Sequence, residues 1–376
     1  MPNTVTVVEM LAFSGCTALE SVTLSNQLTE IPEYLFASAT KGTGTTSSGG
    51  NSGGGVNDGG IPIVPPSGKA NKTPQYKDEP VSNKNSDDAV GLLEDVESCT
   101  ALKSIVIPAD VVTIGKYAFS GCTAMATVTF AANDTLKTLS DYAFMDTGIT
   151  AFNMPNSVTS IGIYQFAGCE NLASLTISSN VTVIPEGMCD KQYGISNNGM
   201  VAFTQLQPCS SLTSIVIPNG ITKIDKYAFR KTTALTSVTF EEGSAITAIG
   251  ESAFEGSAIK TLDLSKATAS NIALEAFAFR AALLETVNLP STLKTIGGTA
   301  FQNCTKLTNL IIPSSVTTIS SNAFKGCTKA QTFYAEATSK PSGWNATTMN
   351  LVNVVYYSET ELAGAWHYVE GVPTLW

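Results

Sequence analysis

Apolar residues recur at a fixed spacing along most of this chain of 376 residues. In each copy an aliphatic residue is followed five positions later by an aromatic residue, as with Ile319 and Phe324. A Leu-x-x-Ile-x-Ile segment or a close variant follows, of which Leu212 to Ile217 is one example. Apolar and polar residues alternate at its end, which predicts a short β-strand with one buried side.

The aromatic position, which we call the anchor, keeps its place in every copy. Anchors lie 22 to 25 residues apart, except for 83 residues before Phe119 and 40 residues before Phe229. These exceptions equal one repeat plus insertions of about 60 and about 17 residues. Cys189 takes the anchor slot of one copy, and Phe takes it in the others: Phe13, Phe36, Phe119, Phe144, Phe166, Phe229, Phe254, Phe279, Phe301 and Phe324.

The length of the repeat predicts a stacked architecture. A unit of about 23 residues is too small to bury its own apolar side, whereas stacked copies bury that side continuously. We therefore expect a repeat solenoid whose strands stack as one parallel sheet. Several predicted strands end at Pro, which cannot donate a hydrogen bond to a neighbouring strand: Pro108, Pro155, Pro218, Pro290 and Pro313.

This repeat resembles that of the BspA-like leucine-rich repeat proteins of bacteria. The resemblance covers about residues 2–36 and 99–335. It implies a right-handed leucine-rich-repeat stack with a parallel β-sheet on the concave side. On the convex side it implies short helical turns or irregular segments. One feature departs from the commonest leucine-rich pattern, because here Cys precedes the strand, where that pattern has Asn or Cys after it.

The repeats divide the chain into a solenoid of about eleven copies over residues 1–335 and an aromatic cap segment over residues 336–376. The first insertion, residues 38–97, is rich in Gly, Ser and Pro and is expected to be flexible because it has little apolar surface to bury. The second insertion spans residues 190–208. Both follow an anchor, so both are expected to leave the solenoid on the same side.

The first residues lie inside a repeat, because residues 2–8 align with residues 313–319. No signal peptide is recognisable there. An uncapped stack would expose strand edges and core side chains. We therefore expect that the N-terminus is truncated.

Composition narrows the possible partners. The net charge is −10, the calculated pI is about 4.7, and only 14% of the residues are charged. No basic patch is present, which argues against nucleic acid and anionic membrane as partners. No apolar run is long enough to span a bilayer. We expect a monomer.

Seven of the eight Cys occupy one repeat slot, three positions after the anchor or just before the strand. We expect them to form a buried row of reduced thiols, because side chains that project in parallel rarely offer disulfide geometry. Cysteine usage therefore leaves the redox compartment open. The seven are Cys16, Cys99, Cys122, Cys169, Cys209, Cys304 and Cys327.

The sequence offers little catalytic chemistry. His367 is the single His, which argues against His-activated nucleophiles and multi-His metal sites. Carboxylates are scattered, no Cys-x-x-Cys occurs, and the Gly-rich stretch has no phosphate-loop motif. We expect no enzyme activity, no catalytic residue, no metal site and no cofactor.

Exposed strand positions give a candidate partner-binding surface between the two insertions. The residue between the last two apolar positions of each strand points outward, and in this stretch such residues carry no charge: Val106, Thr129, Asn153, Thr176 and Val216. The insertions are expected to flank them. The simpler alternative is that these residues are good β-formers on a solvated sheet.

These features favour a non-enzymatic cell-surface or secreted protein that binds another protein or mediates adhesion through its solenoid. The adhesive role comes from the resemblance alone. One alternative is a glycan-binding module that uses the C-terminal aromatics Trp344, Trp366 and Trp376. A structural spacer is another. The expected partner is an extracellular protein or a glycan.

Overall fold

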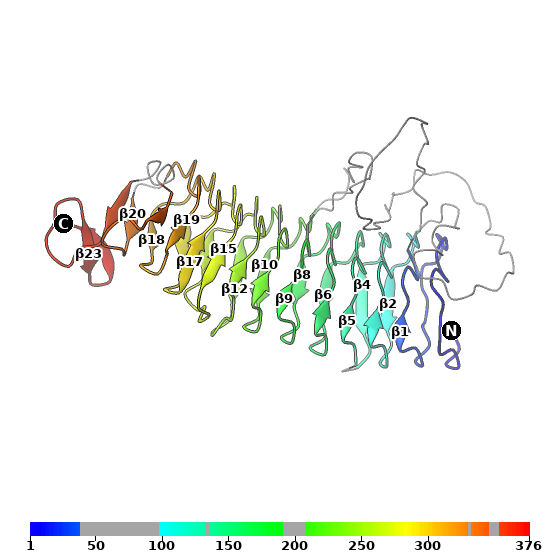
Figure 1. Ribbon diagram of the computed structural model, residues 1–376. Coiled ribbons are helices and arrows are strands. Elements are labelled where there is room, and N and C mark those ends of the chain that lie inside the picture. Colours follow the sequence, from blue (N-terminus) through cyan, green and yellow to red (C-terminus); the bar gives the residue numbers. More distant parts are fainter. Residues whose placement is uncertain (38–97, 133–134, 191–207, 330–331, 346–352) are drawn as a thin grey trace, which may run out of the picture.

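The computed structural model describes residues 1–37, 98–132, 135–190, 208–329, 332–345 and 353–376. These residues form one elongated stack with the two termini at opposite ends (Figure 1). The first insertion and nearly all of the second lie outside the described residues, so the expected flexibility of residues 38–97 stays a prediction.

The stack has two parallel-stranded faces. Face A contains β2 (Ser104–Ile107), β4 (Thr127–Phe130), β6 (Ala151–Asn153), β8 (Ser174–Thr176), β10 (Ser214–Ile217), β12 (Ser237–Phe240), β14 (Thr261–Asp263), β16 (Thr286–Asn288), β18 (Leu310–Ile312), β20 (Phe333–Ala335) and β22 (Val354–Tyr356). Face B contains β1 (Glu30–Ile31), β3 (Thr113–Ile114), β5 (Thr138–Leu139), β7 (Ser160–Ile161), β9 (Val183–Ile184), β11 (Lys223–Ile224), β13 (Ala248–Ile249), β15 (Ile272–Leu274), β17 (Leu293–Ile296), β19 (Thr318–Ile319) and β21 (Gly343–Trp344).

Strands β1 to β20 alternate between the faces, two to a turn, which makes ten turns. Turn 1 contains β1 and β2, and turn 5 contains β9 and β10. The prediction of one sheet is wrong, because the aliphatic residue that precedes each anchor pairs with its copies in the neighbouring turns. The expected eleven copies give about ten turns, since the first copy, within residues 1–24, forms no strand.

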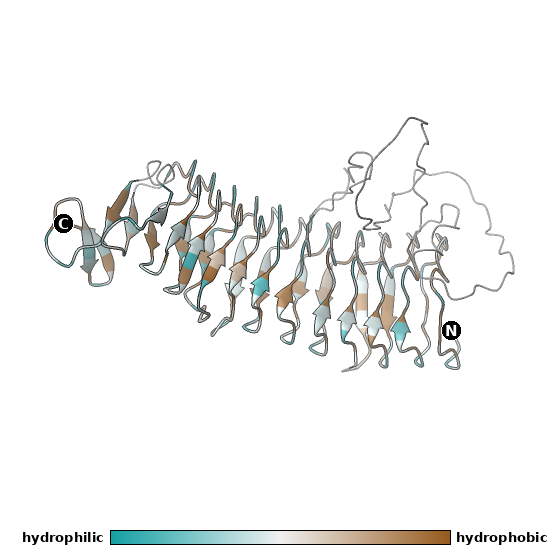
Figure 2. Ribbon diagram, viewed as in Figure 1, coloured by the Kyte–Doolittle hydropathy of each residue, from teal (hydrophilic) through white to brown (hydrophobic). Residues whose placement is uncertain are grey.

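Neighbouring turns match residue for residue. In face A, Ile105 lies opposite Val128 and Val106 opposite Thr129. In face B, Ile114 lies opposite Leu139. Strand β2 alternates exposed and buried residues as the sequence predicts. Hydrophobic residues recur accordingly in strands along the whole stack (Figure 2).

The anchors form the centre of the core. Phe13, Phe36, Phe119, Phe144 and Phe166 stack with ring centroids 5.1 to 6.1 Å apart. Phe229, Phe254, Phe279, Phe301 and Phe324 form a second column at 5.3 to 5.6 Å. Cys189 lies between the two columns in sequence and interrupts them. Such spacings are typical of favourable offset stacking.

The expected helical turns are absent from the part of the chain that the structure describes. Two positions beside the anchor explain this, because the described residues there have positive φ, which a right-handed helix does not allow. One lies two positions before the anchor, as Tyr117 does at φ 56°. The other lies two positions after it, as Asp146 does at φ 54°. No described helix therefore has the length and apolar character needed to cross a membrane.

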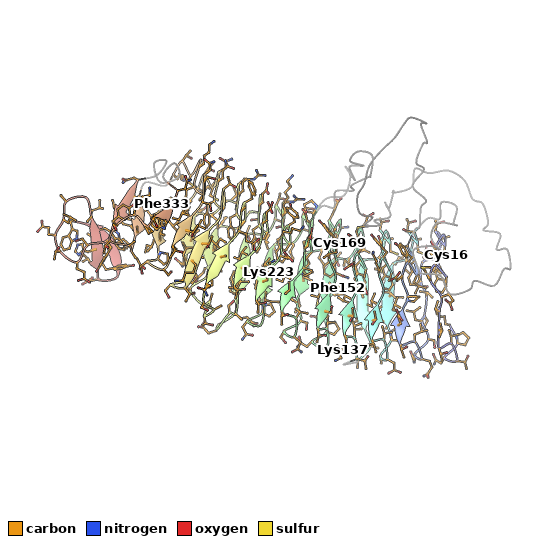
Figure 3. All side chains as sticks on the ribbon, viewed as in Figure 1. Cys16, Lys137, Phe152, Cys169, Lys223 and Phe333 are labelled. Atoms are coloured by element: carbon orange, nitrogen blue, oxygen red, sulfur yellow. The ribbon has the colours of Figure 1, made fainter. Side chains whose placement is uncertain are left out.

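The Cys slots of successive copies lie beside the anchors, and Figure 3 labels one of them, Cys169, within the stack. The thiols of this slot other than Cys16 lie near the carbonyl oxygen of an anchor in an earlier copy, for example Cys169 at 3.1 Å from Phe144. Burial is confirmed for six of the seven predicted residues: Cys99, Cys122, Cys169, Cys209, Cys304 and Cys327. It is wrong for Cys16, which is exposed because no described copy precedes its own.

The last strands extend both faces. β21 pairs with β19 in face B and β22 pairs with β20 in face A. A hairpin of β23 (Trp366–Val369) and β24 (Val372–Leu375) follows. Trp344 and Trp366 are buried, and their indole N–H groups donate to the carbonyl oxygens of Val316 and Ala335 at 3.0 and 2.8 Å. These two side chains therefore cover the end of the core.

Truncating an anchor should cause a large but local loss of stability. Phe229 is fully buried and stacks on Phe254 at 5.3 Å. Phe229→Ala should lower the free energy of unfolding by about 3–5 kcal/mol, as truncation of buried aromatics does. Hydrogen exchange should accelerate mainly in turns 5 to 7, because turns contact only their neighbours. Leu283→Ala, at an exposed position, is the control, and equal acceleration in all turns would contradict local coupling.

Asp146 should make stability depend on pH. Burial, and secondly the charge of Glu170, raises the pKa of its carboxyl group from 3.8 to about 6. Protonation therefore favours the folded state, and this contribution is complete below pH 3.8 and lost as the pH rises through about 6. Asp146→Asn should raise the free energy of unfolding by about 2–3 kcal/mol at neutral pH, and Asn tolerates the positive φ.

Urea unfolding of both proteins at about pH 4 and about pH 7.5 measures this effect. The advantage of the Asn variant should be small at the lower pH and full at the higher one. An equal difference at both values would show that the carboxyl charge is not the cause.

Candidate functional site

All five predicted partner-binding residues lie on face A, and all are exposed. They come from consecutive face A strands, β2 to β10. Val106 lies opposite Thr129, and Asn153 lies opposite Thr176. The structure therefore brings them into one column, from Val106 to Val216, whose two valines are 57% and 51% exposed.

This column crosses a seam between turns 4 and 5. On face A, β8 and β10 are neighbours but are not paired. On face B, β7 and β9 are likewise unpaired. Both sheets are therefore interrupted between the same two turns. The turns stay connected near the anchors, where the Tyr164 N–H donates to Glu186 and the Phe166 N–H donates to Met188, each at 2.9 Å.

Pro185 explains the seam on face B. In turns 2 to 4 and from turn 6 onward, the residue after the face B strand donates its N–H to the preceding turn, as Gly162 does to Leu139 at 2.7 Å and Asp225 to Ile184 at 2.8 Å. Pro185 takes this place in turn 5 and has no N–H to donate. The bond to turn 4 therefore cannot form, and the two strands separate.

A hollow of about 290 Å³ marks the seam on face A. Its walls come from β8 and β10, from residues next to these strands, and from Glu241 after β12. Thr176 and Val216, two of the predicted residues, line it together. The other lining groups are mainly aliphatic and hydroxyl side chains, and Glu241 supplies the carboxylate. The sequence placed both residues on one face but gave no sign of the hollow, which depends on strand separation.

A second hollow of about 300 Å³ lies between β12 and β14. These strands pair only at Ser237 and Thr261, so they diverge beyond that point. Lys260, Asp263 and Lys266 line it. A hydrogen bond from Ser265 lowers the pKa of the Asp263 carboxyl group. This hollow is charged, unlike the candidate column, and the sequence pattern did not single it out.

The second insertion leaves turn 5 beside a buried ion pair. The Asp190 side chain is fully buried and accepts two hydrogen bonds from Arg230, at 3.1 and 2.6 Å. Arg230 also lies over the ring of Tyr227 at 4.3 Å. Paired, two-point contacts of this kind fix geometry. The start of the insertion is thus held against turn 6, although the walls that the insertions were expected to form lie outside the described residues.

A strip of stacked tyrosines lies along the same edge, and the sequence interpretation missed it. Tyr34, Tyr117, Tyr142 and Tyr164 stack at 4.9, 4.6 and 5.6 Å. The signal was Tyr two positions before the anchor in four successive copies. The strip ends at Gly187, where a Cβ atom would lie 2.2 Å from the Tyr164 ring. Because the ring faces cover one another, they offer no platform for stacking sugars.

The C-terminal aromatics do not form the exposed trio that a glycan site would need. Trp344 and Trp366 are buried, and only Trp376, at 37% exposure, reaches solvent. His367 stacks on Trp376 with centroids 3.6 Å apart and so covers one face of the indole. Among the described residues, no group of three His, Cys, Asp or Glu side chains is arranged to hold a metal ion.

A comparison with protein families finds the same repeat. A family model described as the BspA type leucine rich repeat region matches residues 1–48, 96–200 and 199–331 in six copies. No curated protein matches the chain.

Similar solved structures include a leucine-rich repeat protein from Bacteroides ovatus, with 18% identity, a TM-score of 0.37, and coverage of 70% of this chain and 80% of that one. A leucine rich cell surface protein from Faecalibacterium prausnitzii has 24% identity, a TM-score of 0.36, and coverage of 68% and 60%. The pneumococcal vaccine antigen PcpA has 21% identity, a TM-score of 0.36, and coverage of 72% and 62%. The chain thus spans about three fifths of the last two proteins.

The matched ranges include most of the chain and contain every strand from β1 to β19. The chain belongs to the BspA-type leucine-rich repeat family.

Proposed function

We propose that this chain is a non-enzymatic binding protein, secreted or displayed at a cell surface, that engages an extracellular protein through face A at the seam. The observation that carries the proposal is the hollow between β8 and β10, which Thr176 and Val216 line together. Membership of a bacterial repeat family supports the surface location and the adhesive role by analogy.

The chemistry of the hollow suits a protein partner. Its volume of about 290 Å³ is at the lower end of ligand pockets, and it is large enough for one or two apolar side chains from a partner. A few side chains that are buried in this way dominate the affinity of protein interfaces. The surrounding column of Thr, Asn and Val residues carries no formal charge, so covering it requires little desolvation of ions.

Two observations support a role without catalysis. The single His lies in the hairpin, where its ring stacks on Trp376. The most buried ion pair, Asp190 with Arg230, fixes the base of the second insertion and leaves both charges neutralised by each other. Neither arrangement provides a general base or a nucleophile aimed at a cavity.

The runner-up is a glycan-binding role for the C-terminal hairpin, favoured by the exposure of Tyr368 at 41% and Trp376 at 37%. The burial of Trp344 and Trp366 reduces this surface to the two remaining rings. A glycan array probed with the full chain and with Trp376→Ala tests it, and loss of glycan signal in the variant would support it.

The main test uses two exposed valines that belong to the same turn but to opposite faces. Val216→Glu places a charge in the hollow, and Val183→Glu places the same charge on face B, where the side chain is 38% exposed. Binding to an array of purified extracellular proteins and to intact cells should fall at least about tenfold for Val216→Glu, because a buried unpaired charge costs more than 1.4 kcal/mol.

Val183→Glu should bind as the unaltered protein does, and both variants should keep their thermal unfolding midpoints, since both substituted side chains are exposed. Equal binding by the two variants would place the partner elsewhere on the molecule.

A further inference from the structure

Turn 5 carries a second thiol in an unusual place. Cys189 occupies the anchor slot, where every other copy has Phe. Cys209 occupies the ordinary Cys slot of the same turn, after the second insertion. Both side chains are fully buried. These two are the only Cys pair in the described residues that shares one turn.

The backbones of Cys189 and Cys209 are as close to each other as those of the equivalent residues in turns without an insertion. The Cys209 N–H donates to the Cys189 carbonyl oxygen at 3.0 Å. Turns without an insertion have the same bond between residues three apart, as from Cys122 to Phe119 at 3.2 Å. Residues joined in this way have Cα atoms less than about 7 Å apart, which is the range that disulfides require.

The side chains approach each other as well. Both side chains belong to the hydrophobic core, and the Cys209 thiol lies 3.3 Å from the carbonyl oxygen of Phe166. Both are free thiols in the structure. Cys residues of neighbouring turns are less well placed to form a disulfide. Their Cβ atoms project in parallel at the strand spacing of about 4.8 Å. That exceeds the Cβ separation of about 3.5–4.5 Å that a disulfide needs.

We propose that Cys189 and Cys209 form a disulfide that closes turn 5 across the base of the second insertion, which departs from the reduced state that the repeat pattern predicts for Cys209. The other cysteines stay reduced. The bond adds a covalent closure at the seam, where both sheets lack their hydrogen bonds to turn 4. It also fixes the two ends of the insertion to each other, which removes freedom from the unfolded chain.

A small-molecule disulfide such as oxidised glutathione supplies the oxidation. One Cys thiolate attacks its sulfur–sulfur bond, which forms a mixed disulfide and releases one glutathione thiolate. The other Cys thiolate then attacks the protein-bound sulfur and releases the second glutathione. Two cysteine protons end on the two glutathione thiols, and one sulfur–sulfur bond replaces another.

Burial determines when this reaction can take place. It raises the pKa of the Cys209 thiol well above its usual range. A buried thiol that stays protonated reacts slowly. Oxidation therefore takes place during folding, before the two side chains are covered.

The test is to refold the full chain in a buffer of reduced and oxidised glutathione, alkylate free thiols in denaturant, and measure the intact mass. Six of the eight thiols should be alkylated, and proteolysis should yield one linked peptide that joins Cys189 to Cys209. Reductant should restore eight alkylated thiols and lower the thermal unfolding midpoint by several degrees.

Two variants serve as matched controls. Cys189→Phe restores the residue of the other copies, and Cys209→Ala copies the residue that Ala282 supplies in the same slot. Each should give seven alkylated thiols with or without reductant, and its midpoint should not respond to reductant. Eight alkylated thiols in the refolded unaltered chain, or a linked peptide between any other pair, would overturn the proposal.

Discussion

The fold depends on one constraint, which is that each turn must present its backbone groups to the next turn in the same register. A single turn has too little apolar surface to be stable alone. The hydrogen bond from Gly162 to Leu139 at 2.7 Å recurs in equivalent form along face B. The positive-φ residues that the structure describes beside the anchors give successive turns the same shape, so that these bonds and the stacked Phe rings coincide.

The sequence predicts the parts of the fold that side-chain periodicity encodes. Anchor burial, the alternation of β2 and the outward direction of Val106 and Val216 all follow from apolar spacing. Face B was missed because strands such as Thr113–Ile114 have two residues, too few to show an alternating pattern. The prediction of helical turns was wrong because residues such as Tyr117 adopt positive φ there. Their residue type does not predict this backbone conformation.

The hollow could not be predicted because it depends on bonds that do not form. The sequence does not distinguish Pro185 from the other prolines of the chain, because its effect depends on its position directly after a face B strand. Pro32 occupies the same place in turn 1. Both turns that carry an insertion therefore lack the N–H that joins a turn to its predecessor on face B. Each insertion thus belongs to a turn that lacks one face B hydrogen bond, although Phe13 and Phe36 still stack at 5.1 Å beside the first insertion.

This association bears on how a repeat protein can bind at one place. A stack of identical turns presents the same chemistry at every step, so a partner that fits one turn fits the next almost as well. Specificity requires a difference in affinity between positions. The surface at the seam differs from that of the paired turns. Thr176 and Val216 line a hollow between unpaired strands, whereas Val106 and Thr129 lie on directly paired strands. Interrupted hydrogen bonding, which weakens the scaffold locally, thereby also distinguishes the hollow between β8 and β10 from the paired positions of face A.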